Sequence, residues 1–154
     1  MTMTDKVELA ATDKAIIGEL QVQGRLAYAK LAPRVGLSEA ATRQRVNRLL
    51  ERGVMEIGAV TDPTRLGLRH QSMVGINVDA DVRDIADELA KIEAIDYVVV
   101  TAGRYDVLAE VFCADATEFL GIINDQIRPI AGISNLEILT YLDLVKQTYN
   151  WGTA

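Results

Sequence analysis

The apolar residues of this 154-residue chain change their spacing near residue 70, and the change limits the folds that the chain can adopt. In the first sixty residues they recur every three or four positions, which is the period of an amphipathic helix. From Ser72 onward, short runs alternate between apolar and polar residues, which is the period of a strand, and helical stretches separate these runs. The pattern predicts an α+β protein with a helical N-terminal part and a mixed C-terminal part.

Three helices are predicted in the N-terminal part. The first is expected to begin at Thr12, a residue type that caps helices, and to stop at Gly24. The second covers about residues 28–34, and Gly36 then permits a tight turn into the third. A helix-turn-helix is predicted over residues 28–52 from the spacing of three residues. They are Ala32, a small residue where two helices would cross, Gly36 in the turn, and Thr42, which faces inward.

The third helix, which Ser38 can cap and which is expected to run through Arg52, presents two faces. Its inner stripe comprises Thr42, Val46, Leu49 and Leu50. Its outer face comprises Arg43, Gln44, Asn47 and Arg48. Arginine and glutamine can each make two hydrogen bonds to a base edge in the major groove, to guanine and to adenine respectively. Arg45 lies beside the inner stripe, so we expect it to contact phosphate or to position the helix rather than to read a base.

Charge is distributed unevenly around a formal net charge of −6. Residues 1–60 hold nine Lys or Arg and seven Asp or Glu, a charge of +2, whereas residues 61–154 hold seven and fifteen, a charge of −8. Within residues 25–52, seven basic residues face two acidic ones, which gives a local charge of +5. Such asymmetry indicates a nucleic-acid surface attached to a domain with another role. A solvated basic helix face, or a helical bundle that contacts another protein, would show the same charge and period.

The two parts are joined by residues of mixed character. Residues 54–60 form a strand-like run, which we interpret as the wing of a winged helix or as a connecting strand. Residues 61–71 are then predicted to link a domain of residues 1–60 to a domain of residues 72–154.

The C-terminal part is predicted to contain four strands and two helices. The strands are expected at residues 72–78, 97–101, 106–114 and 133–145. The helices are expected after Asp81 and after Asp115, each of which can cap a helix, and Glu118 completes a capping box with Asp115. The order β-α-β-β-α-β is the signature of a ferredoxin-like split βαβ unit.

Several short motifs are spread along nearly the whole chain. In order, they are Leu9 with Asp13 and Ile16, Gly24-Arg25, Leu31-Ala32, Gly36-Leu37-Ser38, Arg45-Val46 with Arg48-Leu49, Gly53-Val54, Asp62-Pro63 with Gly67, Gly103 with Tyr105-Asp106, Gly132-Ile133 and Lys146. This ordered set resembles the leucine-responsive/asparagine-synthetase (Lrp/AsnC) family of feast-famine regulators. The pattern departs at Ala10, where an acidic residue is common, and at Pro33, which lacks a backbone donor, so that the second helix is either short or begins later.

The resemblance implies a winged-helix head that binds double-stranded DNA. It also implies a C-terminal domain that binds an effector, usually an amino acid, and that forms dimers which assemble into octamers or similar rings. The positions that match the recognition-helix region are Ser38, Arg43, Gln44, Arg45, Asn47 and Arg48. The positions that match the hairpin lining the effector site between dimers are Gly103, Tyr105 and Asp106.

The hairpin has a chemistry that suits a zwitterionic amino acid. Gly103 can adopt a positive φ and lets other groups approach the backbone closely, so exposed amides there could hold a carboxylate. Asp106 could pair with an α-ammonium group, although the residues alone are equally those of an ordinary β-turn. Ile138 stands where the family often has a ligand-binding threonine, which leaves open a more apolar pocket, a different ligand or no ligand.

Catalytic, cofactor and metal sites are not expected, because the residues that would form them are too few. His70 is the only histidine, and we predict that it lies on the surface of the linker. Cys113 is the only cysteine and is predicted to be a buried thiol on a strand. Two alternatives remain: a haem-pathway decarboxylase of similar architecture, which would bind a tetrapyrrole through histidine, and an assembly module whose helical head binds another protein.

The sequence also bears on where the protein works. No stretch approaches the ~18 uninterrupted apolar residues of a membrane span. Residues 1–11 carry no apolar signal-peptide core, and a lone cysteine cannot form an intrachain disulfide. These observations predict a cytoplasmic protein without a membrane partner.

Overall fold

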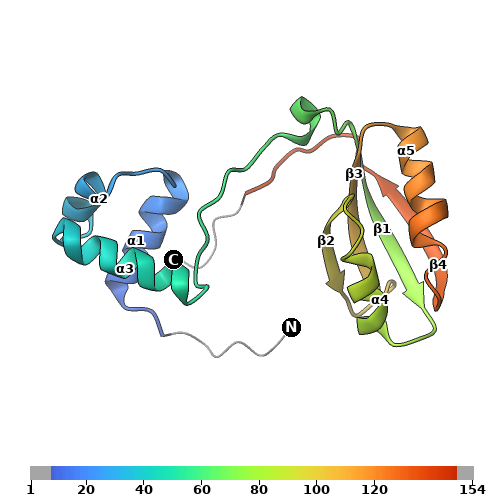
Figure 1. Cartoon of the computed structure of the whole chain (residues 1–154), viewed down its shortest axis with the longest axis horizontal. Helices are drawn as coiled ribbons and strands as arrows, with labels where there is room; N and C mark the ends of the chain where they lie inside the picture. Colours follow the sequence, from blue (N-terminus) through green and yellow to red (C-terminus); the bar gives the residue numbers. More distant parts are fainter. Residues whose placement is uncertain (1–7, 149–154) are drawn as a thin grey trace. The chain divides into compact units, whose positions relative to one another are not determined.

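The computed structural model describes residues 8–148. Residues 1–7 and 149–154 lie outside the described residues, and they include the ends of the two predicted domains and most of the N-terminal stretch that lacks a signal-peptide core. The chain divides into two compact units and passes from the first to the second between Val60 and Thr61 (Figure 1). Each unit has a hydrophobic core of its own.

The N-terminal unit consists of α1 (Ala11–Val22), α2 (Tyr28–Arg34) and α3 (Glu39–Glu51). The apolar stripes of the three helices meet in one core, which explains the helical period of the sequence. The buried core comprises Ile16, Ile17, Leu20, Leu26, Leu31, Val46 and Leu49. Gly36 joins α2 to α3 with a φ of +68°, so the predicted helix-turn-helix is confirmed.

The start of α1 differs from the prediction. Thr12 is the second residue of the helix rather than its cap, because the extended residue Ala10 occupies the capping position. The carbonyl oxygen of Ala10 accepts hydrogen bonds from the backbone N–H groups of Asp13 (2.9 Å) and Lys14 (3.1 Å), so the helical ladder begins earlier than a Thr12 cap would allow.

The short form of the second helix is the one that the structure shows. α2 has seven residues, and Pro33 is the last but one. At that place the missing N–H removes a single ladder bond, and the chain leaves the helix at once. The N–H of Val35 bonds back to the carbonyl oxygens of Leu31 and Ala32, at 3.2 Å each.

The cap and the two faces of α3 are as predicted. Ser38 is the N-cap, and its Oγ accepts a hydrogen bond from the backbone N–H of Ala41 (3.2 Å). Thr42, Val46 and Leu49 point into the core. The buried hydroxyl of Thr42 is satisfied because its Oγ1 donates to the carbonyl oxygen of Ser38 (2.9 Å).

Residues 54–60 do not form the strand predicted as a wing or connection. The segment is largely exposed, with Ile57 at 42% and Val60 at 77%, and no strand occurs in residues 8–60. An extended segment becomes a strand only beside a hydrogen-bonding neighbour, and the described part of this unit supplies none.

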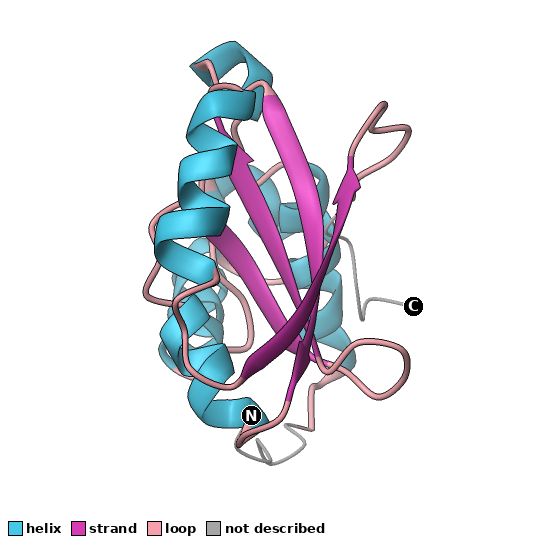
Figure 2. Ribbon diagram, turned by 90° about the vertical axis from the view of Figure 1, so that its right-hand side faces the viewer, coloured by secondary structure: helices cyan, strands magenta, loops and turns pink. Residues whose placement is uncertain are grey.

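The C-terminal unit is a four-stranded antiparallel sheet with two helical connections, preceded by the 3-10 turn η1 (Pro63–Leu66). The strands, in the spatial order β2-β3-β1-β4, are β1 (His70–Val78), β2 (Ile95–Val100), β3 (Val107–Cys113) and β4 (Ile133–Thr140). The helical connections are α4 (Val82–Leu89) and α5 (Ala116–Gly121), which continues as the π-helical turn η2 (Ile122–Ile127) along the sheet (Figure 2). The predicted ferredoxin-like order is confirmed.

One face of this sheet packs against α4, α5 and η2. On β3 the helix-facing residues alternate, and all are buried: Val107, Ala109, Val111 and Cys113. Both predicted caps hold, since Asp81 accepts from the N–H of Arg83 and Asp115 accepts from the N–H of Glu118. In a capping box the carboxylate of Glu118 would accept a hydrogen bond from the N–H of the cap residue, Asp115. Here Glu118 Oε2 accepts instead from the N–H of Ala114 (2.7 Å), the residue before the cap.

Two features near the start of β1 correct the predictions. β4 ends at Thr140 rather than at residue 145, because Thr140 already pairs with Ser72 and β1 begins at His70. His70 is half-buried in that strand rather than on the surface. Its ring centroid lies 4.5 Å from that of Phe119, and its Nε2 lies 3.2 Å from Ser72 Oγ.

The helices of both units are short. α3 has 13 residues, and within residues 8–148 no helix is long and apolar enough to cross a membrane.

Candidate functional site

The exposed side of α3 gathers four of the side chains that the sequence assigned to DNA. Arg43, Gln44, Asn47 and Arg48 are all exposed and occupy positions i, i+1, i+4 and i+5 of one helix. Residues three and four apart lie above one another on a helix, so these four form one surface, here called the α3 outer face. Ser38 is exposed at the N-terminal end of the same helix.

Arg43 is held in place by two neighbours. Its Nη2 lies 3.2 Å from Glu39 Oε1, and its guanidinium carbon lies 5.3 Å from the centre of the Tyr28 ring. Both side chains of the ion pair are more than half exposed, at 59% and 52%, so the pair is weak enough to open when another partner approaches. Tyr28 was not predicted as a site residue, although an aromatic residue at the first position of α2 was a visible signal.

Arg45 points the other way, into the unit. Its Nη1 lies 2.8 Å from Oδ1 of Asp13, a residue of α1 that is 8% exposed. Arg45 thus lies beside the inner stripe, as its position in the sequence indicated, and apart from the α3 outer face, although the resemblance placed it in the same recognition-helix region.

Carboxylates from α1 lower the positive charge of the helix-turn-helix. Within residues 25–52, seven basic and two acidic residues give a charge of +5. Asp13 and Glu19, which lie outside that range, pair with Arg45 (2.8 Å) and Arg34 (2.6 Å). With these two carboxylates included, the local charge is +3, and it lies on the exposed residues Arg25, Lys30 and Arg52, because the exposed charges of α3 cancel one another.

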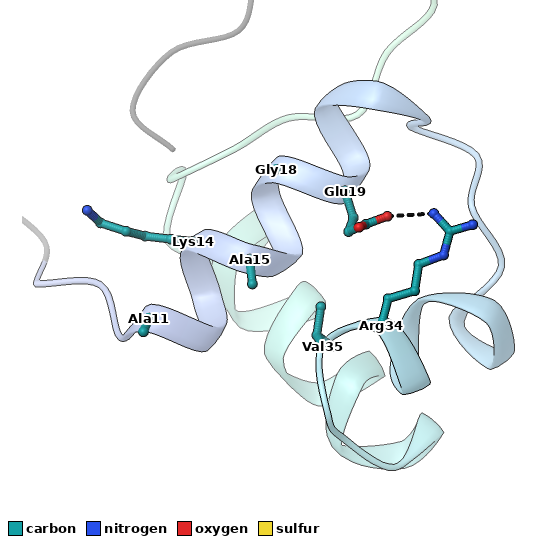
Figure 3. Close-up of a pocket in the computed structure, with 7 residues that line it drawn as sticks. All are labelled: Ala11, Lys14, Ala15, Gly18, Glu19, Arg34 and Val35. Carbon is teal, nitrogen blue, oxygen red and sulfur yellow. Dashed lines mark hydrogen bonds and ion pairs between the residues drawn. The ribbon is translucent and has the colours of Figure 1, made fainter. Parts of the chain in front are cut away.

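Figure 3 shows Glu19 of α1 and Arg34 of α2 pointing toward one another at a crevice of about 480 Å³. The remaining lining residues are Ala11, Lys14, Ala15, Gly18 and Val35. Most of them are small or apolar, so the crevice offers few hydrogen bonds to a polar ligand.

A larger groove of about 1000 Å³ lies beside α1, the end of α3 and residues 53–60. Its apolar lining includes Leu9, Ile17, Leu20, Leu50, Val54 and Ile57. The segment predicted as a wing thus forms one wall of a groove, and this groove holds none of the predicted site residues.

The loop between β2 and β3 holds the residues that the resemblance assigned to an effector. Gly103 is exposed and has a φ of +152°, which favours glycine. Asp106 ties the loop to β1, because its Oδ2 accepts from the N–H of Val78 (2.9 Å) and its own N–H donates to the carbonyl oxygen of Ile76 (2.9 Å). Of the described residues, none donates a hydrogen bond to its other carboxylate oxygen.

Tyr105 fixes the same loop against the sheet. Its ring lies over Gly75 of β1 so closely that a Cβ at that position would come within 2.7 Å of Tyr105 Cδ1. A hydrogen bond with Glu137 of β4, helped by burial, raises the pKa of Tyr105. Arg104 lies 5.4 Å from the Tyr105 ring centre and 2.6 Å from Glu137 Oε2.

Gly75, Arg104 and Glu137 were missed by the sequence analysis. The only signal for Arg104 was its place between two motif residues. Gly75 and Glu137 come together because they pair directly across β1 and β4, and a sequence read element by element does not give that register. Ile138, the position of the absent threonine, instead pairs with Val74.

The sheet face opposite the helices exposes several apolar side chains, although the Tyr105 ring covers Gly75 on it. One row across the four strands consists of Tyr97, Glu110, Met73 and Leu139, in pairing order. Tyr97 and Leu139 are 51% and 44% exposed. Glu110 accepts a hydrogen bond from the hydroxyl of Tyr141 (2.7 Å), and burial together with this bond raises the pKa of Tyr141.

Groups suited to metal binding or nucleophilic chemistry are scarce in residues 8–148. Among them no cluster of three or more His, Cys, Asp or Glu side chains could hold a metal ion. Burial raises the pKa of the Cys113 thiol, and the nearby carboxylates of Glu118 and Asp115 raise it further. Cys113 is therefore protonated near neutral pH, as a structural thiol is.

Two family models match the chain. Residues 9–50 match the AsnC-type helix-turn-helix domain. Residues 68–154 match the C-terminal dimeric alpha+beta barrel domain of AsnC-type transcription regulators. The first match lies within the first unit, and residues 68–145 of the second match lie within the second unit.

Whole proteins are similar as well. An uncharacterised HTH-type transcriptional regulator of Pyrococcus abyssi (strain GE5 / Orsay) is 32% identical over 97% of this chain and 93% of its own length. The solved leucine response regulatory protein LrpA of Mycobacterium tuberculosis is 27% identical, with a TM-score of 0.81 over 93% of this chain and 99% of that one. A transcriptional regulator of Neisseria meningitidis, solved as a complex with L-Met, shares the fold with a TM-score of 0.85 at 24% identity, over 94% of this chain and 97% of that one.

Proposed function

Because the chain belongs to the Lrp/AsnC family of transcription regulators, we propose that it recognises its DNA sites through the α3 outer face. Arg43, Gln44 and Asn47 read base edges in the major groove, and Arg48 contacts the phosphate backbone. Ser38 and the N-terminus of α3 lie near a phosphate, since a helix N-terminus favours an anion.

The observation that carries this proposal is the exposed cluster of hydrogen-bonding groups on one side of a single capped helix. An α-helix fits the major groove, which is about 12 Å wide. There Arg43 can make two hydrogen bonds to guanine, and Gln44 and Asn47 can each make two to adenine. Arg43 already extends between Glu39 and Tyr28, so less side-chain freedom is lost when it meets a base.

The test is binding of the full-length protein to labelled genomic fragments at several salt concentrations. We expect at least one fragment to bind about 1000-fold more tightly than random DNA. Arg48→Ala should weaken binding to all fragments alike and reduce the slope of log K against log salt by about 0.9. Arg65→Ala, which changes an exposed arginine of η1, is the control and should leave the slope unchanged. A wild-type protein that binds every fragment equally would contradict the proposal.

We further propose that residues 1–60 are the DNA-binding domain, that residues 72–154 bind an effector and control assembly, and that residues 61–71 link them. The effector is an amino acid held at the loop of Gly103, Tyr105 and Asp106. Two observations support this chemistry: the exposed backbone of Gly103 and the Asp106 oxygen to which no residue in 8–148 donates a hydrogen bond. The complex of the Neisseria regulator with L-Met also supports the ligand class.

The sheet face opposite the helices supports self-association. We propose that a second copy of the chain covers the row of Tyr97, Met73 and Leu139, and that such dimers assemble into octamers or similar rings. Light scattering after size exclusion tests this. Leu139→Glu should release monomers of 16.9 kDa, whereas Leu120→Glu, an exposed leucine on α5, should leave dimers intact. A wild-type monomer would contradict the proposal.

The matched relatives are named as transcription regulators and not as enzymes, which favours a regulator over the decarboxylase and the assembly module. A regulator works where the chromosome is, and we propose that this place is the cytoplasm.

A further inference from the structure

An ion pair joins the first turn of α1 to the middle of α3. Asp13 Oδ1 and Arg45 Nη1 lie 2.8 Å apart, although the two residues are 32 positions apart in the chain. The side chain of Asp13 is 11% exposed and that of Arg45 is 31% exposed. The pair therefore lies inside the helical unit, between the core and the DNA-facing side of α3.

The burial of Asp13 decides what Arg45 can do. If Arg45 turned outward to a phosphate, the Asp13 carboxylate would remain buried without the partner that the structure gives it, which is strongly unfavourable. Two other pairs of the same unit lack this constraint. In Arg43–Glu39 both side chains are exposed, and in Arg34–Glu19 the carboxylate is 34% exposed against 11% for Asp13, so water can reach both carboxylates.

The position of the pair on α3 links it to recognition. Arg45 lies between Gln44 and Val46, that is, between the outer face and the core stripe, so a bond from it to α1 resists rotation of α3 about its own axis. Side chains on a helix reach about 5–6 Å from its axis, so a rotation of about 20° would move the outer side chains by about 2 Å. A shift of that size breaks a bidentate contact with a base, whereas a phosphate contact tolerates it.

We propose that Asp13 and Arg45 are positioning residues that fix the rotation of α3, and that Arg45 does not bind DNA itself. This inference rests on the proposed recognition of DNA by the α3 outer face. Asp13 then becomes a determinant of sequence specificity, although it belongs to α1 and not to the recognition helix.

Asp13→Asn gives results of opposite sign for the two roles of Arg45. If the pair positions α3, the substitution lowers the affinity for the preferred fragment about tenfold and changes the affinity for random DNA by less than about twofold. If Arg45 is a phosphate ligand that Asp13 restrains, the same substitution releases it and raises the affinity for all DNA. Such a general rise would overturn the inference.

Arg45→Gln in the Asp13→Asn background checks the result through the salt dependence. A positioning role leaves the slope of log K against log salt at its wild-type value, whereas loss of a phosphate ligand lowers it by about 0.9. The amide pair of this double variant retains a hydrogen bond without a buried charge, which protects folding. Thermal denaturation of each variant verifies that it is folded at the assay temperature.

Glu19→Gln is the matched control, because it removes an α1 carboxylate from an exposed arginine pair that does not involve α3. It should leave the ratio of specific to random binding unchanged. A wild type without sequence preference would contradict the proposed function and this inference together. A wild type with a preference that Asp13→Asn leaves intact would contradict this inference alone.

Discussion

The two units expose their candidate functional residues on different kinds of support. In the N-terminal unit, Arg43 and Asn47 project from one helix whose cap and core stripe are set by nearby residues. In the C-terminal unit, Gly103 and Tyr105 lie on a loop whose position depends on contacts with β1 and β4 as well as on bonds from Thr101 at its base. The recognition helix should therefore form even when distant parts of the fold change, although its rotation depends on Asp13, whereas the loop should be sensitive to changes in the sheet.

The largest expected effect tests that sensitivity at Gly75. Gly75→Val places a branched side chain where the Tyr105 ring lies, since even a Cβ would come within 2.7 Å of the ring. We expect a loss of about 3 kcal/mol in the free energy of unfolding of the C-terminal unit. We also expect loss of any amino-acid-induced rise in melting temperature, while DNA binding by α3 persists. Retained ligand response would show that Tyr105 does not need Gly75.

The corresponding change on the helix is Arg43→Ala. It should weaken binding to the preferred fragment by about 2 kcal/mol and relax the preference at one base pair. Because the side chain is 59% exposed, the melting temperature should hardly change. Competition binding with fragments mutated one base pair at a time measures the effect. Equal weakening on every fragment would instead assign Arg43 to the phosphates.

Asp106→Ala probes the loop without crowding it. It removes the acceptor of the Val78 N–H, which should lower the free energy of unfolding by about 1 kcal/mol. A thermal-shift screen of the twenty amino acids on the wild type and on this variant measures both effects. A stabilising amino acid whose effect survives the substitution would place the effector elsewhere.

The smallest effect concerns alkaline pH and the core rather than either site. Burial raises the pKa of Cys113 above its ordinary value of 9.0, so the unfolded chain loses this proton at a lower pH than the folded protein. The contribution of this thiol to stability should thus be constant below about pH 9, and stability should fall above it. Urea denaturation at increasing pH measures the fall, and Cys113→Ala should make its onset later. The pKa of Tyr141 is also raised, from an ordinary 10.0, so some decline should remain in that variant.

The sequence predicted those features that depend on neighbours within one element. The Ser38 cap, the buried stripe of α3 and the burial of Cys113 follow from helical and strand periods, and the structure has all three. Features that depend on packing between distant segments were not predicted. The spacing of Asp13 and Arg45 says nothing about their contact, because it depends on how α1 crosses α3.

Residues 54–60 show that a local pattern can also predict too much. Their alternating pattern is that of a strand, yet these residues form no strand, because a strand also needs a hydrogen-bonding partner. The early end of β4 has this cause as well, since its length is set by where β1 begins.

The inward direction of Arg45 also affects how a regulator of this kind searches a chromosome. Attraction to random DNA grows with the number of phosphates that free cations neutralise. Because Arg45 points into the unit and neutralises no phosphate, each molecule leaves irrelevant stretches sooner, so more of the chromosome is sampled in a given time. Slow departure is then reserved for sequences that the outer side chains of α3 can recognise.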